Sequence, residues 1–363
     1  MTPAPAAPTR PPSRARSTAG LIAAVLAAGA LIGGGHNSTP AAVTGRVTIA
    51  QAWPHAARAD LPDLLSTPKL FLDAGTAVGT LPTRDATYLR LVIEDNHGVR
   101  RELHRLPDTD NPQYDNLTVA GDDLIWTEST DRQHVSIWAA NLRTTAPARR
   151  LTTGTGNATF YGSQYDLIVT GGRVYWTAAQ DSDTTQVRSV PLTGGPVSVR
   201  TEPGAWALTA WPWLTDTAGG GQSGTSRLRN LTTGRDLTIA SSGTELPTCT
   251  PTWCRVMVMT SQGLARIDLM HPDGTARRTI ASGEVETEID EPAALDRFTI
   301  YGTVSPDAAL NHQAQLLAYD ITTRRSIEIS PAAADVQYHA GILCWTTGNQ
   351  QSFIRHALDL RTI

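Results

Sequence analysis

Acidic residues gather at three places in this chain, and their oxygen atoms could bind a cation. The clusters are DTDNPQYDN (108–116), Asp181 with Asp183, and EVETEIDE (284–291). In the first, the spacing of Asp108, Asp110, Asn111 and Asp115 is similar to the ligand spacing of a calcium loop. In the third, an extended backbone would place three glutamates on one strand face. Like charges stacked there would repel one another unless water or a cation separated them. None of the clusters has the central glycine of a calcium loop, so we expect solvated loops between strands.

Motifs of known catalytic machinery are absent from the sequence. It contains no His-Glu-x-x-His, Gly-x-Ser-x-Gly or Walker-type lysine motif. Ser223 lies in the glycine-rich segment AGGGQSGTS, but without a lysine this segment is better interpreted as a flexible loop. The nine histidines are scattered and suit surface or turn positions, although groups from distant segments could still converge in the fold. The sequence therefore predicts no catalytic residue, no metal site and no cofactor, and it leaves the ligand-binding residues unknown.

The spacing of two of the three cysteines predicts a disulfide bond. Cys249 and Cys254 lie in CTPTWC, where the close spacing suits a bond across a turn between two strands. So small a ring constrains the unfolded chain little, by about 2 kcal/mol. The alternative is a pair of free thiols. Cys344, in ILCWTT, has the surroundings of a small buried apolar residue.

The N-terminus has the pattern of an export signal. Residues 1–16 form a basic segment without acids, which we expect to be disordered, and residues 17–35 carry no charge. Residues 17–35 are interpreted either as a signal peptide cut after Ala30 or as a single transmembrane anchor with the arginines inside. Residues 36–44 follow as a linker, and residues 45–363 form the folded domain. We expect this domain to lie outside the cytoplasm, either tethered to the cell membrane or secreted.

Composition excludes several classes of protein. The chain has 363 residues, a net charge of −4 and 40% hydrophobic residues. This charge gives no electrostatic reason for nucleic-acid binding. The composition also excludes collagen-like, coiled-coil and fully disordered proteins.

The domain is built from short apolar segments that recur along the chain. Each is rich in β-branched or aromatic residues and is followed by a polar turn and a second, alternating strand. The segments are YLRLVIED (88–95), DDLIWTES (122–129), GRVYWTAA (172–179), TAWPWLTD (209–216), CRVMVMTS (254–261), RFTIYGTV (297–304) and ILCWTTGN (342–349). Their mean spacing is about 42 residues, which is the length of a four-stranded propeller blade. The sequence thus predicts an all-β propeller with seven blades, and six or eight remain compatible with the uneven spacing.

The last repeat is too short to complete a blade by itself. Propellers avoid the resulting free edge when the other end of the chain supplies a strand. The N-terminal candidate is Arg46–Ala50, which we expect to pair with residues 352–360.

The tryptophans recur in phase with the repeats. Trp126, Trp138, Trp176 and Trp345 fall at strand positions, which predicts packing between blades rather than a ligand surface. Trp253 lies inside the CTPTWC turn and is expected to be exposed.

These features together resemble a group of bacterial propellers. The Thr-Gly…Arg turns and the tryptophan- or tyrosine-bearing strands are similar to those of TolB-like, YncE-like and WD40-like proteins. The basic leader, AQAWP (50–54), GTAVG (75–79), PTWCRV (251–256) and LMHPDGTARR (269–278) resemble uncharacterised exported propellers of actinobacteria more closely. The resemblance implies the propeller fold and the exported location, and it transfers no catalytic residue.

Two functions of different classes are compatible with such a domain. The first is a monomeric binding module for a protein, peptide or glycan, with no nucleic-acid partner and with membrane contact only through residues 17–35. The missing catalytic motifs favour this function over an enzyme. The alternative is a hydrolase or lyase of a cell-surface polymer, with polar residues that meet at the propeller channel.

Overall fold

The computed structural model describes residues 46–62, 64–216, 224–261, 263–303, 313–349 and 352–363. Val47–Ile363 form one compact unit. The predicted leader and linker, residues 1–44, lie outside the described residues. Within the described part of the chain, no helix is long and apolar enough to cross a membrane.

Nearly all regular structure in this unit is β-strand, as predicted. Five sheets have four antiparallel strands each, in chain order. The first holds β2 (Thr67–Asp73), β3 (Thr76–Pro82), β4 (Tyr88–Asp95) and β5 (Arg100–Pro107). The second holds β6 (Gln113–Ala120), β7 (Asp123–Thr130), β8 (Gln133–Asn141) and β9 (Arg149–Thr152). The third holds β10 (Ile168–Thr170), β11 (Arg173–Asp181), β12 (Thr184–Pro191) and β13 (Ser198–Pro203). The fourth holds β14 (Ala207–Leu208), β15 (Trp213–Thr215), β16 (Arg227–Asn230) and β17 (Asp236–Thr238). The fifth holds β18 (Glu245–Cys249), β19 (Cys254–Thr260), β20 (Gly263–Met270) and β21 (Arg278–Ser282).

A sixth sheet has seven strands, in the order β1-β27-β26-β25-β24-β23-β22. Its strands are β1 (Arg58–Leu61), β22 (Val285–Thr287), β23 (Phe298–Thr303), β24 (Ala314–Asp320), β25 (Arg325–His339), β26 (Ile342–Asn349) and β27 (Ser352–Asp359). The long β25 pairs with β24 through residues 325–333 and with β26 through residues 334–339. The described helices are short: α2 (Ile49–Ala52), η2 (Asp108–Asp110) and η3 (Leu360–Thr362).

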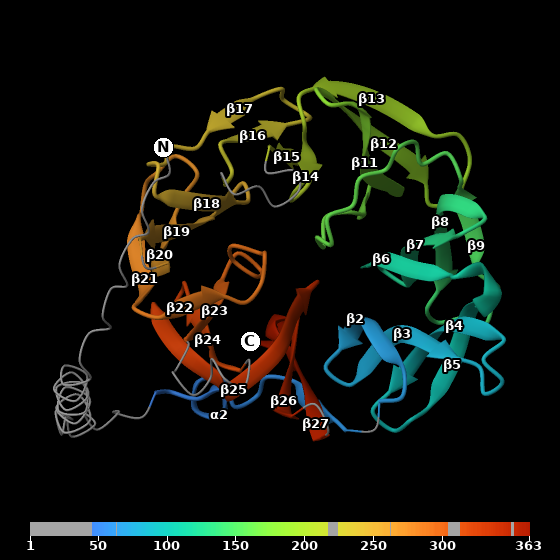
Figure 1. The fold of residues 1–363 in the computed structure, drawn as a ribbon, viewed down its shortest axis with the longest axis horizontal. Coiled ribbons are helices and arrows are strands. Elements are labelled where there is room, and N and C mark those ends of the chain that lie inside the picture. The colour runs from blue at the N-terminus through green and yellow to red at the C-terminus, as the bar shows by residue number, and fades with distance from the viewer. Residues whose placement is uncertain (1–45, 63, 217–223, 262, 304–312, 350–351) are drawn as a thin grey trace, which may run out of the picture. The chain divides into compact units, whose positions relative to one another are not determined.

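The sheets follow one another around a ring, which is the arrangement of a β-propeller (Figure 1). Within a sheet, the first strand lies toward the centre and the last at the periphery, as β6 and β9 show (Figure 1). Each of the seven apolar segments predicted to be strands contains an observed one: β4, β7, β11, β15, β19, β23 and β26. Tight hairpins join many strands; at the β10–β11 turn, Gly171 and Gly172 both have positive φ, which such turns require.

Apolar side chains fill the spaces between neighbouring sheets, and tryptophans lie at their centres. Trp126, fully buried, packs with residues of the β2–β5 and β6–β9 sheets. Trp176, also fully buried, lies in a cluster with Ile125 and Ile137 of the preceding sheet. Trp345 joins β26 to the residues of β23 and β24. The interpretation of these tryptophans as packing residues is confirmed.

An N-terminal segment does pair with the last long strand, but it is not the one expected. β1 pairs antiparallel with β27, in the register Arg58↔Leu358 to Leu61↔Arg355. The expected donor, Arg46–Ala50, instead enters α2 at Ile49, and Thr48 forms an isolated parallel bridge to Glu328 of β25. Both segments pack an apolar residue against the core. Leu61 of β1 enters the cluster of Phe71 and Ile342, whereas Ile49 packs against a different cluster.

Candidate functional site

A cavity lies where the sheets converge. It has a volume of about 690 Å³, within the usual size range of small-molecule sites. Its wall includes residues of β2, β14, β15, β18, β19, β22, β25 and β26 and of two connecting segments, residues 161–166 and 288–292. We call it the axial cavity.

The two connecting segments reach toward the centre of the ring (Figure 1), and a side-chain hydrogen bond joins them. Gln164 Nε2 donates to Glu291 Oε2 at 2.5 Å. Gln164 Oε1 in turn accepts from the backbone N–H of Ala340, at 3.1 Å. The Tyr165 hydroxyl also donates to Glu291. One short loop therefore ties together residues that lie 127 and 176 positions away in the chain.

Asp166 stabilises the backbone conformation of this loop by accepting hydrogen bonds from N–H groups of the loop itself. Its Oδ2 accepts the backbone N–H groups of Tyr161 at 2.8 Å and Ser163 at 3.0 Å. Burial nevertheless raises the pKa of Asp166 to about 6, since the backbone bonds offset only part of the desolvation.

Arg255 holds the second connecting segment in place. Its side chain is 3% exposed and comes from β19. Its Nη1 donates to the carbonyl oxygens of Ile289 at 2.5 Å and Glu291 at 3.2 Å. Burial lowers the pKa of Arg255 to about 10, so the group stays protonated at neutral pH. By donating from its Nη atoms to neighbouring backbone oxygens, this buried cation fixes the path of the chain that carries the glutamates.

Two glutamates of this segment hold protons near neutral pH. Burial raises the pKa of Glu291, which is 9% exposed, to about 7. Burial and a hydrogen bond with Glu286 raise the pKa of Glu288 to about 7 as well. His339 of β25 also lines the cavity, and burial lowers its pKa to about 4, which keeps the imidazole neutral.

The raised pKa of Glu291 makes stability depend on pH. The folded protein holds a proton on this group up to about pH 7, whereas the unfolded chain releases it near 4.5. Between these values the folded state binds more protons, so the free energy of unfolding falls as pH rises, by up to about 3 kcal/mol. Glu291→Gln imitates the protonated form and should remove this contribution.

The measurement is urea unfolding of the wild type, Glu291→Gln and the exposed control Glu284→Gln at about pH 5 and about pH 8. We expect the wild type and Glu284→Gln to lose more stability than Glu291→Gln between the two values. Parallel pH profiles for all three proteins would contradict the assignment.

The expectation of three solvated acidic loops is correct in part. Asp110 pairs with Arg132 at 3.2 Å and Asp115 with Lys69 at 3.0 Å, both on the surface. For EVETEIDE the expectation is wrong at two positions, because Glu288 and Glu291 face the axial cavity. Within the described residues, no group of three or more His, Cys, Asp or Glu is placed to hold a metal ion. Ser223 lies outside the described residues.

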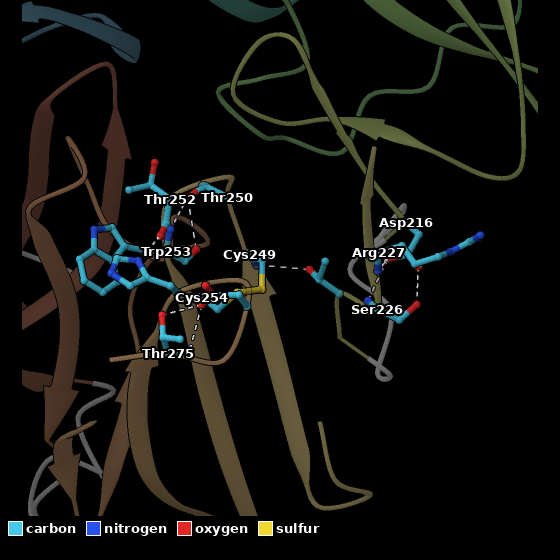
Figure 2. The surroundings of a disulfide bond; sticks show 12 residues. Asp216, Ser226, Arg227, Cys249, Thr250, Thr252, Trp253, Cys254 and Thr275 are labelled. Atoms are coloured by element: carbon cyan, nitrogen blue, oxygen red, sulfur yellow. Dashed lines mark hydrogen bonds and ion pairs between the residues drawn. A yellow bond between two sulfur atoms is a disulfide. The ribbon is translucent and has the colours of Figure 1, made fainter. Parts of the chain in front are cut away.

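The predicted disulfide is confirmed. Cys249 ends β18, Cys254 begins β19, and the two sulfur atoms are bonded (Figure 2). Cys249 also lines the axial cavity, so the bond fixes one part of the wall. Cys344 is a buried free cysteine, as expected.

Trp253, expected to be exposed, is 9% exposed. Its ring stacks on His271, with 4.1 Å between centroids, and Arg278 lies over it at 5.4 Å. Its indole Nε1 also donates to the carbonyl oxygen of Asp296, at 3.2 Å, so the turn packs against both its own sheet and the next segment.

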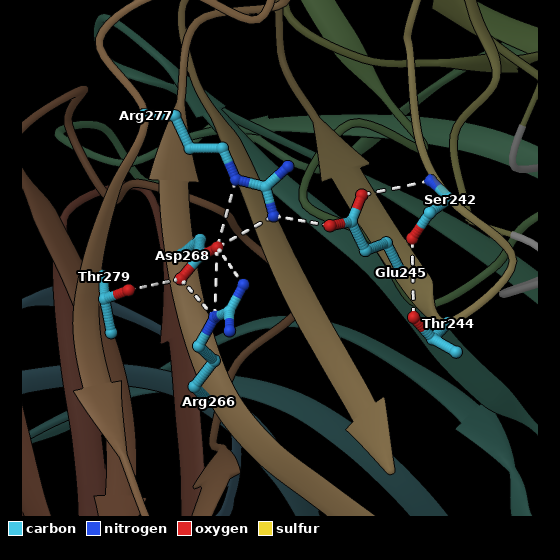
Figure 3. Close-up of polar contacts among 7 residues, drawn as sticks. All are labelled: Ser242, Thr244, Glu245, Arg266, Asp268, Arg277 and Thr279. Carbon is cyan, nitrogen blue, oxygen red and sulfur yellow. Dashed lines mark hydrogen bonds and ion pairs between the residues drawn. The ribbon is translucent and has the colours of Figure 1, made fainter.

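Another polar cluster lies within the β18–β21 sheet and is structural. Asp268, 2% exposed, accepts from Arg277 Nη2 at 2.8 Å and from Thr279 Oγ1 at 2.8 Å (Figure 3). Arg277 also donates to Glu245 at 2.7 Å. Although burial opposes it, these bonds and one from Arg266 lower the pKa of Asp268. The charged side chains of this cluster pair with one another through hydrogen bonds, and these bonds link β18, β20 and the start of β21.

A hydroxyl, an imidazole and a carboxylate line up on the outer strands. His356 Nε2 lies 2.7 Å from Thr347 Oγ1, and His356 Nδ1 lies 2.7 Å from Asp60 Oδ1. This is the order of groups in a catalytic triad. The three residues lie outside the wall of the axial cavity, on β26, β27 and β1, and they join these strands. Asp60 also lines a second cavity, of about 510 Å³.

Comparison with known proteins supplies no family. No family model matches the sequence, and no curated protein matches it significantly. Similar solved structures include an oligogalacturonate lyase in complex with manganese, at 14% identity and a TM-score of 0.45, covering 76% of this chain and 79% of that one. The β-propeller domain of the Trilobed protease from Pyrococcus furiosus is similar at 9% identity and a TM-score of 0.44, and the match covers 78% of this chain and 89% of that one. A puromycin hydrolase is similar at 12% identity and a TM-score of 0.44, and the match covers 83% of this chain and 53% of that one. Likeness at this level says nothing about the activity of this chain.

Proposed function

We propose that residues 47–363 form a seven-bladed propeller that binds a small polar ligand in the axial cavity. The count of seven comes from the five four-stranded sheets and from a division of the seven-stranded sheet at β25. β1 then completes the last blade as its fourth strand. The uncharged segment 17–35 and the disulfide support a location outside the cytoplasm.

The observation that carries the proposal is the axial cavity itself. Its wall combines apolar surface with polar groups from distant parts of the chain, the usual makeup of a ligand site. Three buried polar atoms of wall residues have no hydrogen-bond partner among the described residues: Arg255 Nε, Glu288 Oε1 and His339 Nδ1. Such groups are costly, and their concentration at one cavity is typical of a functional site.

The proposal is tested with a panel of short peptides and oligosaccharides in a thermal-shift assay. Gln337 lines the cavity with an exposed side chain, so Gln337→Trp should fill the space without disturbing the core. A ligand at about 100 times its Kd should stabilise the wild type and Gln337→Ala by about 2.7 kcal/mol, but not Gln337→Trp. A ligand that stabilises all three equally binds elsewhere and contradicts the proposal.

One observation favours a second candidate, a hydrolase or lyase of a surface polymer. Glu288 and Glu291 hold protons at about neutral pH, which is what a general acid needs. Release of products from a polysaccharide by the wild type, abolished in Glu288→Gln or Glu291→Gln, would favour this function over binding alone.

A further inference from the structure

We propose that the ligand of the axial cavity carries a primary ammonium group, which the carboxyl groups of Glu288 and Glu291 bind. This inference rests on the proposed function and adds the chemical class of the ligand. It follows from the charges of the wall, from the position of Glu288 and from the partners of Arg255.

Acidic groups outnumber available basic groups in the wall. Four acidic residues line it: Asp166, Glu288, Asp290 and Glu291. The basic residues are Lys69, Arg255 and His339. Lys69 is paired at 3.0 Å with Asp115, which lies outside the wall. A cation that enters the cavity would therefore find an excess of carboxyl groups in a partly desolvated site, where a charge pair is stronger than in water.

Arg255 offsets this excess only in part, through its electrostatic attraction to Asp290 and Glu291. Its Nη atoms donate to the backbone oxygens of Ile289, Asp290 and Glu291, at 2.5 to 3.4 Å. The described residues form no ion pair between Arg255 and a carboxylate. The guanidinium thus anchors the backbone and forms no hydrogen bond with either glutamate side chain. Glu291 already accepts from Gln164, whereas one oxygen of Glu288 has no partner among the described residues.

Glu288 is held in the wall with unused bonding capacity. Its Oε1 is buried without a hydrogen-bond partner, and its carboxyl group bonds to Glu286. Gly302 of β23 makes room for it, since a Cβ at that position would lie 2.0 Å from Glu288 Oε1. A bound ammonium offers three N–H donors, which a carboxylate accepts in charge-assisted hydrogen bonds.

The rest of the wall suits the carbon part of such a ligand. Apolar side chains of Phe71, Leu208, Leu246 and Ile342 come from four different strands. An ammonium on a short carbon skeleton would satisfy both parts of the wall.

The test measures binding by calorimetry at about pH 7, with three matched pairs of probes. Each pair compares a free amine with its N-acetylated form, which removes the charge and keeps the rest of the molecule. The pairs are Nα-acetyl-lysine methylamide, tri-alanine amide and the fully deacetylated chitobiose, each against its acetylated counterpart. They separate a side-chain amine, a chain-end amine and an amino sugar as sources of the ammonium.

We expect at least one free amine to bind about tenfold more tightly than its acetylated form. Glu288→Gln and Glu291→Gln should each reduce this preference to about threefold or less, while the exposed control Glu284→Gln should retain it. Glutamine imitates the protonated glutamate, and melting curves check that each variant is folded.

Two results would overturn the inference. One is equal or tighter binding of the acetylated members; if Gln337→Trp blocks that binding, the cavity remains a ligand site and only the ammonium is wrong. The other is no binding of any free amine at about 10 mM, a weaker affinity than a specific ammonium site would show. A neutral ligand from the panel that Gln337→Trp blocks would then leave the proposed function standing, whereas failure of both assays would remove both.

Discussion

Leu61→Asp is expected to lower the free energy of unfolding by about 4 kcal/mol. Leu61 is 4% exposed at the end of β1, and it packs against Phe71 of β2 and Ile342 of β26. The substitution removes this apolar contact and buries a charge, so β1 should detach from β27. For a domain of this size the melting temperature should fall by roughly 10 °C.

Arg58→Asp is the matched control, because it changes an exposed residue of the same strand. Its melting temperature should stay within about 2 °C of the wild type. If both variants melted like the wild type, β1 would not hold the ring together.

Trp176→Ala is expected to destabilise the protein by about 4 kcal/mol. Its side chain is fully buried between the β6–β9 and β10–β13 sheets, where it packs against Ile125 and Ile137. The indole Nε1 also donates to the carbonyl oxygen of Thr155 at 2.9 Å. Alanine leaves a large cavity between the two sheets and one unpaired carbonyl.

Trp176→Phe separates these contributions, since it keeps most of the volume and loses the hydrogen bond. We expect it to cost about 1 to 2 kcal/mol, which chemical denaturation can resolve from the alanine variant. A loss below about 1 kcal/mol for Trp176→Ala would show that the sheets do not pack through this residue.

Much of the fold could be predicted because it follows from local patterns that repeat. Segments such as 88–95, 173–181 and 342–349 are apolar, β-branched or aromatic, and bounded by turn residues. Backbone pairing makes such segments strands wherever they occur. The repeat length then selects the propeller, since each unit must bury its faces against its neighbours.

The closing strand could not be located in this way. Arg46–Ala50 and Arg58–Leu61 are both short and alternating, so local propensity does not separate them. The choice depends on contacts with Phe71 of β2 and Ile342 of β26, which lie 342 − 71 = 271 residues apart in the chain and which only folding brings together.

The position and lining of the axial cavity could not be predicted from the sequence either, apart from one acidic segment. The segment EVETEIDE (284–291) contributes Glu288 and Glu291 to the cavity wall, and its pattern was unusual because stacked glutamates need either water or a counter-charge. The sequence does not show that Gln164 reaches Glu291 or that Arg255 fixes the backbone beside it. These contacts join three different sheets or loops, and no motif encodes them.

The position of a bound ligand tests the central claim most directly. A crystal structure of residues 47–363 with the tightest-binding free amine would locate it. The account predicts ligand density in the axial cavity, with the ammonium nitrogen about 3 Å from a carboxylate oxygen of Glu288 or Glu291. Density on an outer sheet face, with the axial cavity filled by water alone, would contradict it.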